Sequence, residues 1–477
     1  MSDQMQSAPN LMKRRADILE LYKANKRGQT EAACHALLEE TPDDAETLSM
    51  LAAVLIDRQA FTEAEAALRR AHELAPHAPI PWTNLGRFLQ QHNRWGEALE
   101  HYRAAAARFP NNPTFSATLG QICQRAGHFA EAEAAFRRAS KLQPQNAGML
   151  VNTGMVVLRQ DRVDEAIDLF KSAIAINPQL AAAYGNLGNA EQKRGDLAAA
   201  EAAYEKASIL DPKDVLTYVS LGLAKLRRGD AREAADIFDR AIARHGPERR
   251  AAAWFPYARA QELGQMPAGF RAELARVVSR VTLTPPPGYA SMNELNAALA
   301  EALRADPTLT WEPAGKATRL GGQTGLLLDH PLEPFLAFEK TLRAAIDAHF
   351  AAIKIEKKHP YFGYVPETYQ LDLWGTLLSE GGHQHPHIHI GGWLSGVYYV
   401  ALPPSMGKGE ARDGWIEFGH PPPDFKADFE PVALAYEPRE GDALFFPSYI
   451  FHRTLPFSGE AQRISLAFDV KPTSWKQ

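Results

Sequence analysis

The spacing of apolar residues divides the chain into two parts of different character. Up to about residue 280, apolar residues recur at helical spacing, which predicts amphipathic helices. From about residue 366 they instead form short runs rich in β-branched and aromatic side chains, separated by glycine and proline. Such runs predict β-strands. We therefore expect an α-helical part followed by a part built on a β-sheet.

A period of 34 residues runs through the helical part. Proline recurs at this step, and so do a glycine, an alanine, a large residue four positions after that alanine, and a second alanine. The small residues suit places where paired helices cross closely, the large residue fills the space between them, and proline separates one pair from the next. The prolines are Pro42, Pro76, Pro110, Pro144, Pro178 and Pro212.

This period and residue order resemble the tetratricopeptide repeat, a helix–turn–helix unit that stacks into a solenoid. The resemblance implies a superhelix whose concave wall is lined by the first helix of each pair. Two positions before each repeat glycine stands a short amide or hydroxyl side chain, and such a ladder can hydrogen-bond the backbone of an extended peptide. It is similar to the asparagine ladder of protein O-GlcNAc transferases, although polar helix faces are also common without a ligand. The predicted substrate-binding residues are Asn84, Thr118, Asn152, Asn186 and Ser220.

The 34-residue step is lost after Pro247. Residues 250–280 still have helical spacing, and we expect them to cap the open end of the solenoid. A run of three prolines and a glycine then breaks the pattern. The predicted domains are a repeat solenoid over 1–247, capping helices with a proline-rich linker over 248–290, and a further domain over 291–477.

The last domain is predicted to be a jelly roll with supporting helices. Amphipathic spacing predicts helices over 291–305 and 331–352. The short apolar runs that follow are typical of a β-sandwich or jelly roll. The predicted fold class is thus an α-solenoid followed by a double-stranded β-helix.

Composition limits the classes of function. The 477 residues carry 52 Lys and Arg against 57 Asp and Glu, a formal charge of −5, which argues against wholesale nucleic-acid binding. Two cysteines are too few for a disulfide framework or a cysteine-rich zinc site. The first residues lack the apolar core of a signal peptide, and no apolar run is long enough to span a bilayer. We expect a cytoplasmic protein with neither a membrane nor a nucleic acid as partner.

Four of the 16 histidines fall at alternate positions within seven residues. Alternate side chains of an extended chain point to the same face, so two such imidazoles can converge on one metal ion. A proline divides the cluster, and we expect the pair after it, His387 and His389, to be the ligands. His452, in a separate apolar run, is the candidate for a third ligand. His383 and His385 are interpreted as supporting or solvent-facing groups.

The order His-x-His, a long interval, a single His and an Arg eleven residues later resembles the iron(II)/2-oxoglutarate-dependent oxygenases. The runs PHIHIGGWLSGVYYV, GDALFFPSYIFH and RISLAF are similar to a bacterial group of such enzymes. The resemblance implies that His387, His389 and His452 bind Fe(II), with open positions for O2 and the co-substrate 2-oxoglutarate. Arg463 would bind the far carboxylate of 2-oxoglutarate through two parallel hydrogen bonds, and Ser465 could add a third.

One position departs from the pattern of the wider superfamily. Most members have His-x-Asp, whereas this chain has His389 in place of the carboxylate. A site of three histidines carries less negative charge, which makes the iron more electrophilic. The second ligand could instead be Asp372, Asp442 or His385. No catalytic residue is predicted beyond the metal site.

The sequence therefore predicts a 2-oxoglutarate- and Fe(II)-dependent dioxygenase that hydroxylates a side chain of a protein or peptide recruited by the repeats. Repeats also precede the oxygenase domain in aspartyl/asparaginyl β-hydroxylases, and holding a substrate beside the metal raises its local concentration. One alternative is a cupin-like three-histidine metal dioxygenase, although the glutamate expected shortly after His-x-His is absent. The other is a non-catalytic repeat scaffold with an inactive jelly roll.

Overall fold

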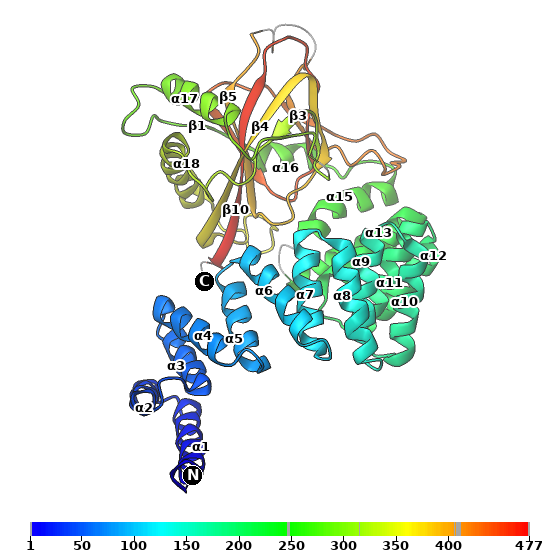
Figure 1. Ribbon diagram of the computed structural model, residues 1–477. Helices are drawn as coiled ribbons and strands as arrows, with labels where there is room; N and C mark the ends of the chain where they lie inside the picture. The colour runs from blue at the N-terminus through cyan, green and yellow to red at the C-terminus, as the bar shows by residue number, and fades with distance from the viewer. Residues whose placement is uncertain (1, 246–248, 314, 405, 407–411, 476–477) are drawn as a thin grey trace. The chain divides into compact units, whose positions relative to one another are not determined.

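The computed structural model describes residues 2–245, 249–313, 315–404, 406 and 412–475 (Figure 1). Its internal contacts divide the chain into two compact units, Met1–Leu210 and Asp211–Gln477. Each unit has hydrophobic clusters of its own. None of the described helices is long and apolar enough to cross a membrane.

The first unit is a stack of helices in which each helix contacts the next one along the chain. Local sequence explains where helices begin and end. Asn112 caps α7 by accepting a hydrogen bond from the Thr114 amide (3.0 Å), and Gly127 ends that helix in the left-handed conformation (φ 80°). The bounds are α1 Ser2–Lys23, α2 Arg27–Glu40, α3 Ala45–Asp57, α4 Phe61–Leu74, α5 Pro79–Gln91, α6 Trp95–Arg108, α7 Pro113–Ala126, α8 Phe129–Leu142, α9 Ala147–Arg159, α10 Val163–Ile176, α11 Ala181–Arg194 and α12 Leu197–Leu210.

The repeat glycines lie where the two helices of a pair touch. In α9, a Cβ added at Gly154 would lie 2.6 Å from the ring of Phe170, which is fully buried in α10. The same close contact recurs from pair to pair, so the small residue and the large ring have the roles that the period predicted. The glycine–ring pairs of this unit are Gly86–Tyr102, Gly120–Phe136, Gly154–Phe170 and Gly188–Tyr204.

Gly154→Ala should lower the free energy of unfolding by about 1–3 kcal/mol, because the packed ring of Phe170 has no room to move aside. Gly96→Ala is the matched control. Gly96 is exposed in α6, and a Cβ there would meet nothing within 4 Å. Alanine also favours a helix over glycine, so the control should be neutral or stabilising. Chemical denaturation measures both changes, and an unchanged stability of Gly154→Ala would contradict the close contact.

The second unit begins with a helical pair of the same kind and adds helices that pack on a sheet. Gly222 in α13 contacts the ring of Phe238 in α14, as in the first unit. Trp254 in α15 packs against the ring of Phe451, with 5.1 Å between centroids. The bounds are α13 Val215–Arg228, α14 Ala231–His245, α15 Arg249–Leu263, α16 Phe270–Val277, α17 Met292–Arg304 and α18 Glu333–Ala352.

The described strands of this unit form one ten-stranded antiparallel sheet that curls on itself (Figure 1). The strand order is β1-β8-β5-β10-β4-β9-β6-β7, with β3 also paired to β4 and β2 to β3. Helices α17 and α18 share a core with the sheet. The bounds are β1 Ser279–Thr282, β2 Thr310–Trp311, β3 Thr318–Gln323, β4 Pro366–His387, β5 Leu394–Ala401, β6 Ile416–Phe418, β7 Leu434–Tyr436, β8 Asp442–Pro447, β9 His452–Thr454 and β10 Arg463–Trp475.

The predicted fold class, a solenoid followed by a jelly-roll-type β domain, is confirmed, and local details differ. The end of the stretch expected to be helical forms β1, which pairs with β8. Pro386 does not end its strand: β4 continues to His387, and the pairing with β9 shifts register between Gln384 and His387. A proline has no N–H to donate to a neighbouring strand, so a shift at this point is expected.

Candidate metal centre

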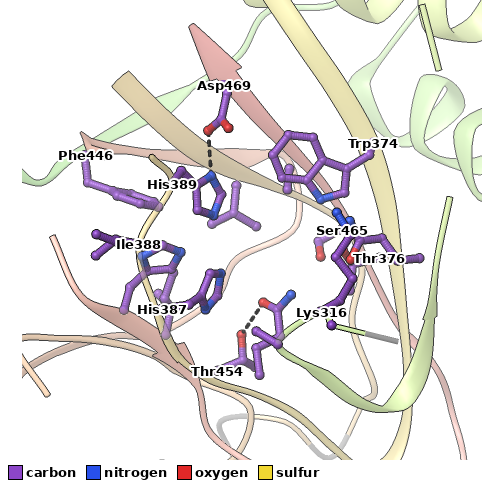
Figure 2. A pocket seen from close by; sticks show the side chains of 18 residues that line it. Lys316, Trp374, Thr376, His387, Ile388, His389, Phe446, Thr454, Ser465 and Asp469 are labelled. Atoms are coloured by element: carbon purple, nitrogen blue, oxygen red, sulfur yellow. Dashed lines mark hydrogen bonds and ion pairs between the residues drawn. The ribbon is translucent and has the colours of Figure 1, made fainter. Parts of the chain in front are cut away.

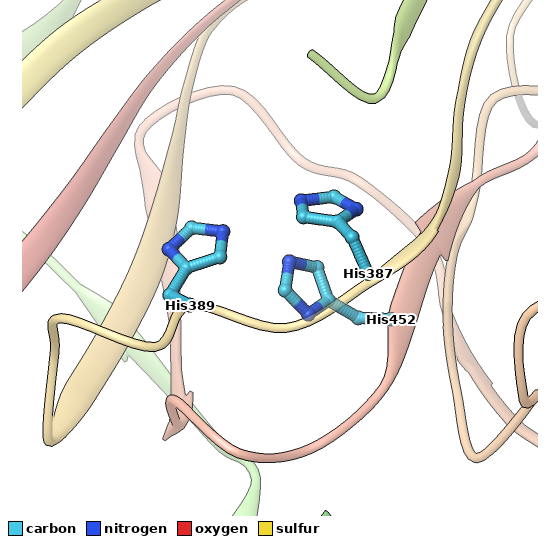
Figure 3. Close-up of side chains that lie close together, drawn as sticks. All are labelled: His387, His389 and His452. Carbon is cyan, nitrogen blue, oxygen red and sulfur yellow. The ribbon is translucent and has the colours of Figure 1, made fainter. Parts of the chain in front are cut away.

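Three histidines converge at one end of the pocket. His387 is the last residue of β4, His389 follows in the loop toward β5, and His452 begins β9, where it pairs with His387. One ring nitrogen of each histidine lies within 4.8 Å of those of the other two (Figure 3). The ring centroids of His387 and His452 are 4.3 Å apart, and those of His389 and His452 are 5.0 Å apart. A single metal ion could therefore contact all three predicted ligands.

Two of these rings are oriented by backbone carbonyls. The Nδ1 of His387 donates to the carbonyl of His385 (2.7 Å), and the Nδ1 of His452 donates to that of Ile450 (3.0 Å). With the proton on Nδ1, the Nε2 of each ring keeps its lone pair for a metal. Burial and the neighbouring His389 lower the pKa of His387 to about 4, and burial lowers the pKa of His452 well below its usual range. Both rings are therefore neutral, the metal-binding form, at neutral pH.

The third ring is oriented by a carboxylate that the sequence analysis did not single out. The Nδ1 of His389 donates to Asp469 at 2.6 Å. Ser395 also donates to Asp469 (2.6 Å), and the hydroxyl of Ser448 lies 2.8 Å from that of Ser395. Burial raises the pKa of Asp469, but the interactions with His389, Ser395 and Lys471 together outweigh it and lower the pKa below its usual range. A Cβ at Gly392 would lie 2.6 Å from the Ser448 hydroxyl, so the loop after His389 passes directly over this network.

Asp469→Asn should weaken Co(II) binding by about 10- to 100-fold, because the amide cannot supply the charge that holds and polarises the His389 ring. Asp372→Asn is the control. Asp372 is the register partner of Asp469 on β4, but its carboxylate pairs with Lys471. Titration of the metal-free protein with Co(II), followed by visible absorption, measures both. An equal loss in the two variants would assign the effect to the sheet and not to His389.

The histidines line a pocket of about 330 Å³ whose opposite wall is polar (Figure 2). Trp374 and Thr376 of β4 face it, and Ser465 of β10 lies beside them. Ser465 pairs in register with Thr376 on one side and with Tyr399 of β5 on the other. The pocket therefore has room for a small molecule between the histidines and the hydroxyl groups of Thr376 and Ser465.

Arg463 lies two residues before Ser465 on β10, so the two side chains point to the same face of the strand. The Arg463 side chain is buried, with only 1% of the residue exposed. Its Nη1 is 3.4 Å from the Ser465 hydroxyl, and its guanidinium lies 5.2 Å from the centroid of the Tyr399 ring. Its Nε and Nη2 have no hydrogen-bond partner, and no carboxylate among the described residues pairs with it. Burial lowers the pKa of Arg463. A buried cation of this kind requires an anion to balance it.

The alternative second ligands lie outside the histidine cluster. Asp372 pairs with Lys471, and Asp442 accepts hydrogen bonds from Arg280 at 3.0 Å and from a threonine. The exposed ring of His385 packs edge-on against another histidine, 5.1 Å between centroids. Of the candidates, His389 alone is brought beside the other two predicted ligands in the described structure.

The ladder positions are half-buried, each on the first helix of a pair. Asn186 already donates to the carbonyl of Ala182 (2.8 Å), which leaves its side-chain oxygen as an acceptor. Ser220 belongs to the second compact unit, and the four other positions belong to the first. A peptide-binding role for these residues stays a prediction.

Comparison with known families separates the same two parts. Models of the tetratricopeptide repeat match residues 118–181, 219–283 and 157–226. The model described as "Putative 2OG-Fe(II) oxygenase" matches residues 372–469, a span that includes all three histidines and Arg463. The protein joins tetratricopeptide repeats to a domain of this oxygenase family. The oxygenase-family domain thus coincides with the strands that build the pocket, and no curated protein matches the chain.

Similar solved structures are repeat proteins. YrrB, a TPR protein with an unusual peptide-binding site, is 22% identical over 39% of this chain and 95% of its own, with a TM-score of 0.35. PilW, a type IV pilus biogenesis factor, is 19% identical over 44% of this chain and 96% of its own, with a TM-score of 0.39. MamA from Desulfovibrio magneticus is 24% identical over 35% of this chain and 93% of its own, with a TM-score of 0.32.

Proposed function

We propose that this protein is a 2-oxoglutarate- and Fe(II)-dependent hydroxylase whose substrate is a protein or peptide held by the repeats. The observation that carries the proposal is the buried Arg463, which has no anionic partner among the described residues and lies on the strand face that leads to three converging imidazoles. A dicarboxylate that binds a metal at one end and needs a cation at the other suits this arrangement.

The described residues fit both groups. The Nε2 atoms of His387, His389 and His452 would hold Fe(II) from one side, because each Nδ1 is already used in a hydrogen bond. Bound together, iron and 2-oxoglutarate would supply an oxidation by O2 in which one oxygen atom converts 2-oxoglutarate to succinate and CO2 and the other hydroxylates a C–H bond of the substrate. Arg463 would bind the far carboxylate through its free Nη2 and Nε, and Ser465 would place a hydroxyl beside it.

Arg463 also favours this function over the two alternatives. A cupin-like three-histidine dioxygenase uses no 2-oxo acid, so it would have no role for a buried cation at this position. A scaffold with an inactive jelly roll would carry an unbalanced buried charge that only destabilises its fold. The hydrogen-bonded orientation of all three imidazoles would likewise serve no purpose in a scaffold.

Anaerobic titration of the metal-free protein with Fe(II) and 2-oxoglutarate tests this function. We expect a visible charge-transfer band that requires both additions, and succinate once O2 is admitted. Fe(II) binding without a band and without succinate would contradict the dependence on 2-oxoglutarate. A protein that binds no Fe(II) would favour the scaffold.

Co-purifying proteins test the substrate class. We expect some of them to gain the mass of one oxygen atom when they are incubated with the wild-type protein, Fe(II) and 2-oxoglutarate. Combined replacement of Asn84, Asn152 and Asn186 by alanine should lower this modification, whereas Asn111→Ala, at an exposed position between two helices, should not. If the triple variant and Asn111→Ala modify the proteins equally, the ladder residues do not bind the substrate.

A further inference from the structure

A second cavity of about 390 Å³ lies within the second unit, between helices α14–α16 and the segment 449–451. Its wall is mostly aromatic and aliphatic, with Phe255 from α15 and Phe270 from α16 among the contributors. No residue lines both this cavity and the metal pocket. Cavities of this volume and character typically hold small molecules.

Two tyrosine hydroxyls of this wall have no hydrogen-bond partner among the described residues. Tyr257 is 2% exposed and Tyr449 is 8% exposed, and burial raises the pKa of both phenols. A third polar group is left open by Pro256 inside α15: because proline has no N–H, the carbonyl of Ala252, another residue of the wall, lacks its usual helical donor. The two hydroxyls are not among the solvent-inaccessible polar atoms that lack a partner, so they are open to whatever fills the cavity.

The charged residues of the wall are either paired or exposed. The carboxylate of Glu273 accepts from His359 (2.7 Å) and from Arg276 (2.9 Å), and it is therefore already balanced. Lys358 is exposed at the edge of the cavity. The wall thus offers two phenol hydroxyls that can donate and the carbonyl of Ala252 that can accept, with Lys358 and Asp239 exposed around them. The two phenols favour an oxygen acceptor on the ligand.

We infer that this cavity binds a small aromatic molecule that carries an acceptor oxygen, such as a carbonyl or carboxylate. The ring packs against the aromatic wall, and the oxygen accepts from Tyr257 or Tyr449. The wall of this cavity includes the three residues that directly precede His452 in the sequence. Residues 449–451 line the cavity, and the carbonyl of Ile450 orients His452. An occupant therefore stabilises the segment that holds a predicted metal ligand.

Ligand-observed NMR on the metal-free full chain tests the site with two probes of matched shape. Acetophenone has a ring and a carbonyl, and isopropylbenzene has the same outline without the oxygen. We expect acetophenone to bind with a dissociation constant of about 1 mM or lower, at least fivefold more tightly than isopropylbenzene. Absence of binding overturns the site. Equal binding of the two probes overturns the need for an acceptor and would instead suit an apolar side chain of a partner.

Substitutions in the wall locate the probe. Tyr257→Phe and Tyr449→Phe keep the shape of the cavity, and at least one should weaken acetophenone about fivefold while leaving isopropylbenzene unchanged. Neither should lower the melting temperature of the free protein, because each removes a hydroxyl that has no partner. Ala253→Leu, which fills the cavity, should abolish binding of both probes. Unchanged acetophenone binding in all three variants would place the probe elsewhere and overturn the proposal.

The link to His452 has its own test, which rests on the proposed function. Saturating acetophenone should tighten Co(II) binding about fivefold, because coupling between two sites is reciprocal and the occupied cavity supports residues 449–451. An unchanged Co(II) affinity in the presence of acetophenone overturns the link to His452 and leaves the cavity as a ligand site. Acetophenone binding by a protein that binds no cobalt counts against the proposed function alone.

Discussion

His452→Ala should lower the affinity for Co(II) by more than about 100-fold and abolish succinate formation. This loss exceeds the one typical of a residue that only hydrogen-bonds a metal ligand. His452 is the one predicted ligand from a different strand, so without it the remaining nitrogens come from a single short segment. The ring is buried beside Phe446, 4.6 Å between centroids, and its removal also leaves a cavity. Circular dichroism and the melting temperature must therefore show that the variant is folded before its cobalt titration is compared.

His385→Ala is the matched control for this prediction. Its ring is exposed and lies outside the cluster, and the hydrogen bond from His387 goes to its backbone carbonyl, which alanine retains. We expect wild-type cobalt binding and turnover. If His385→Ala loses the metal while His452→Ala keeps it, the assigned ligand set is wrong and His385 is a ligand.

The helical repeats could be predicted because their determinants are local and repeated. In each repeat a glycine lies where a Cβ would meet the ring of the next helix, as at Gly154 and Phe170. The same packing therefore requires the same residues at the same spacing in every repeat, and this spacing is visible in the sequence. The compact units could not be predicted in the same way. Helices α13 and α14 have the repeat pattern, yet they belong to the same contact unit as the sheet. The predicted domain limits therefore describe sequence pattern and stay a prediction.

For the metal site, the sequence could predict only which residues of a single strand share a face, because side chains alternate along a strand. His387 and His389 share a face by that rule, and so do Arg463 and Ser465. Continued along β10, the same alternation reaches Asp469, an acidic residue in an apolar strand, and this signal was available. The hydrogen bond between Asp469 and Ser395, and the one between Ser395 and Ser448, could not be predicted, because they depend on which strands pair and on the path of the loop after His389.

Arg463→Met should change ligand binding and stability in opposite directions. Removing the guanidinium should weaken 2-oxoglutarate binding by about 30-fold to several thousand-fold, the range for truncating one partner of a buried charge pair. The ligand-free protein should become more stable by about 1 kcal/mol or more, because an unbalanced buried charge is replaced by an apolar side chain of similar length. Thermal unfolding with Mn(II), with and without 2-oxoglutarate, measures both effects on one sample. The wild-type protein should gain stability from the co-substrate, and the variant should not.

Two controls separate this interpretation from a general role in folding. Arg463→Lys keeps the charge but loses the two-pronged geometry, so it should retain weak 2-oxoglutarate binding. Arg280→Met removes an arginine of the same unit that does have a partner, the carboxylate of Asp442 at 3.0 Å. Leaving that carboxylate unpaired should lower the melting temperature, the opposite of the change expected at Arg463. A fall in stability of the same size in both methionine variants would mean that the Arg463 charge is already balanced within the fold, and the 2-oxoglutarate assignment would lose its main support.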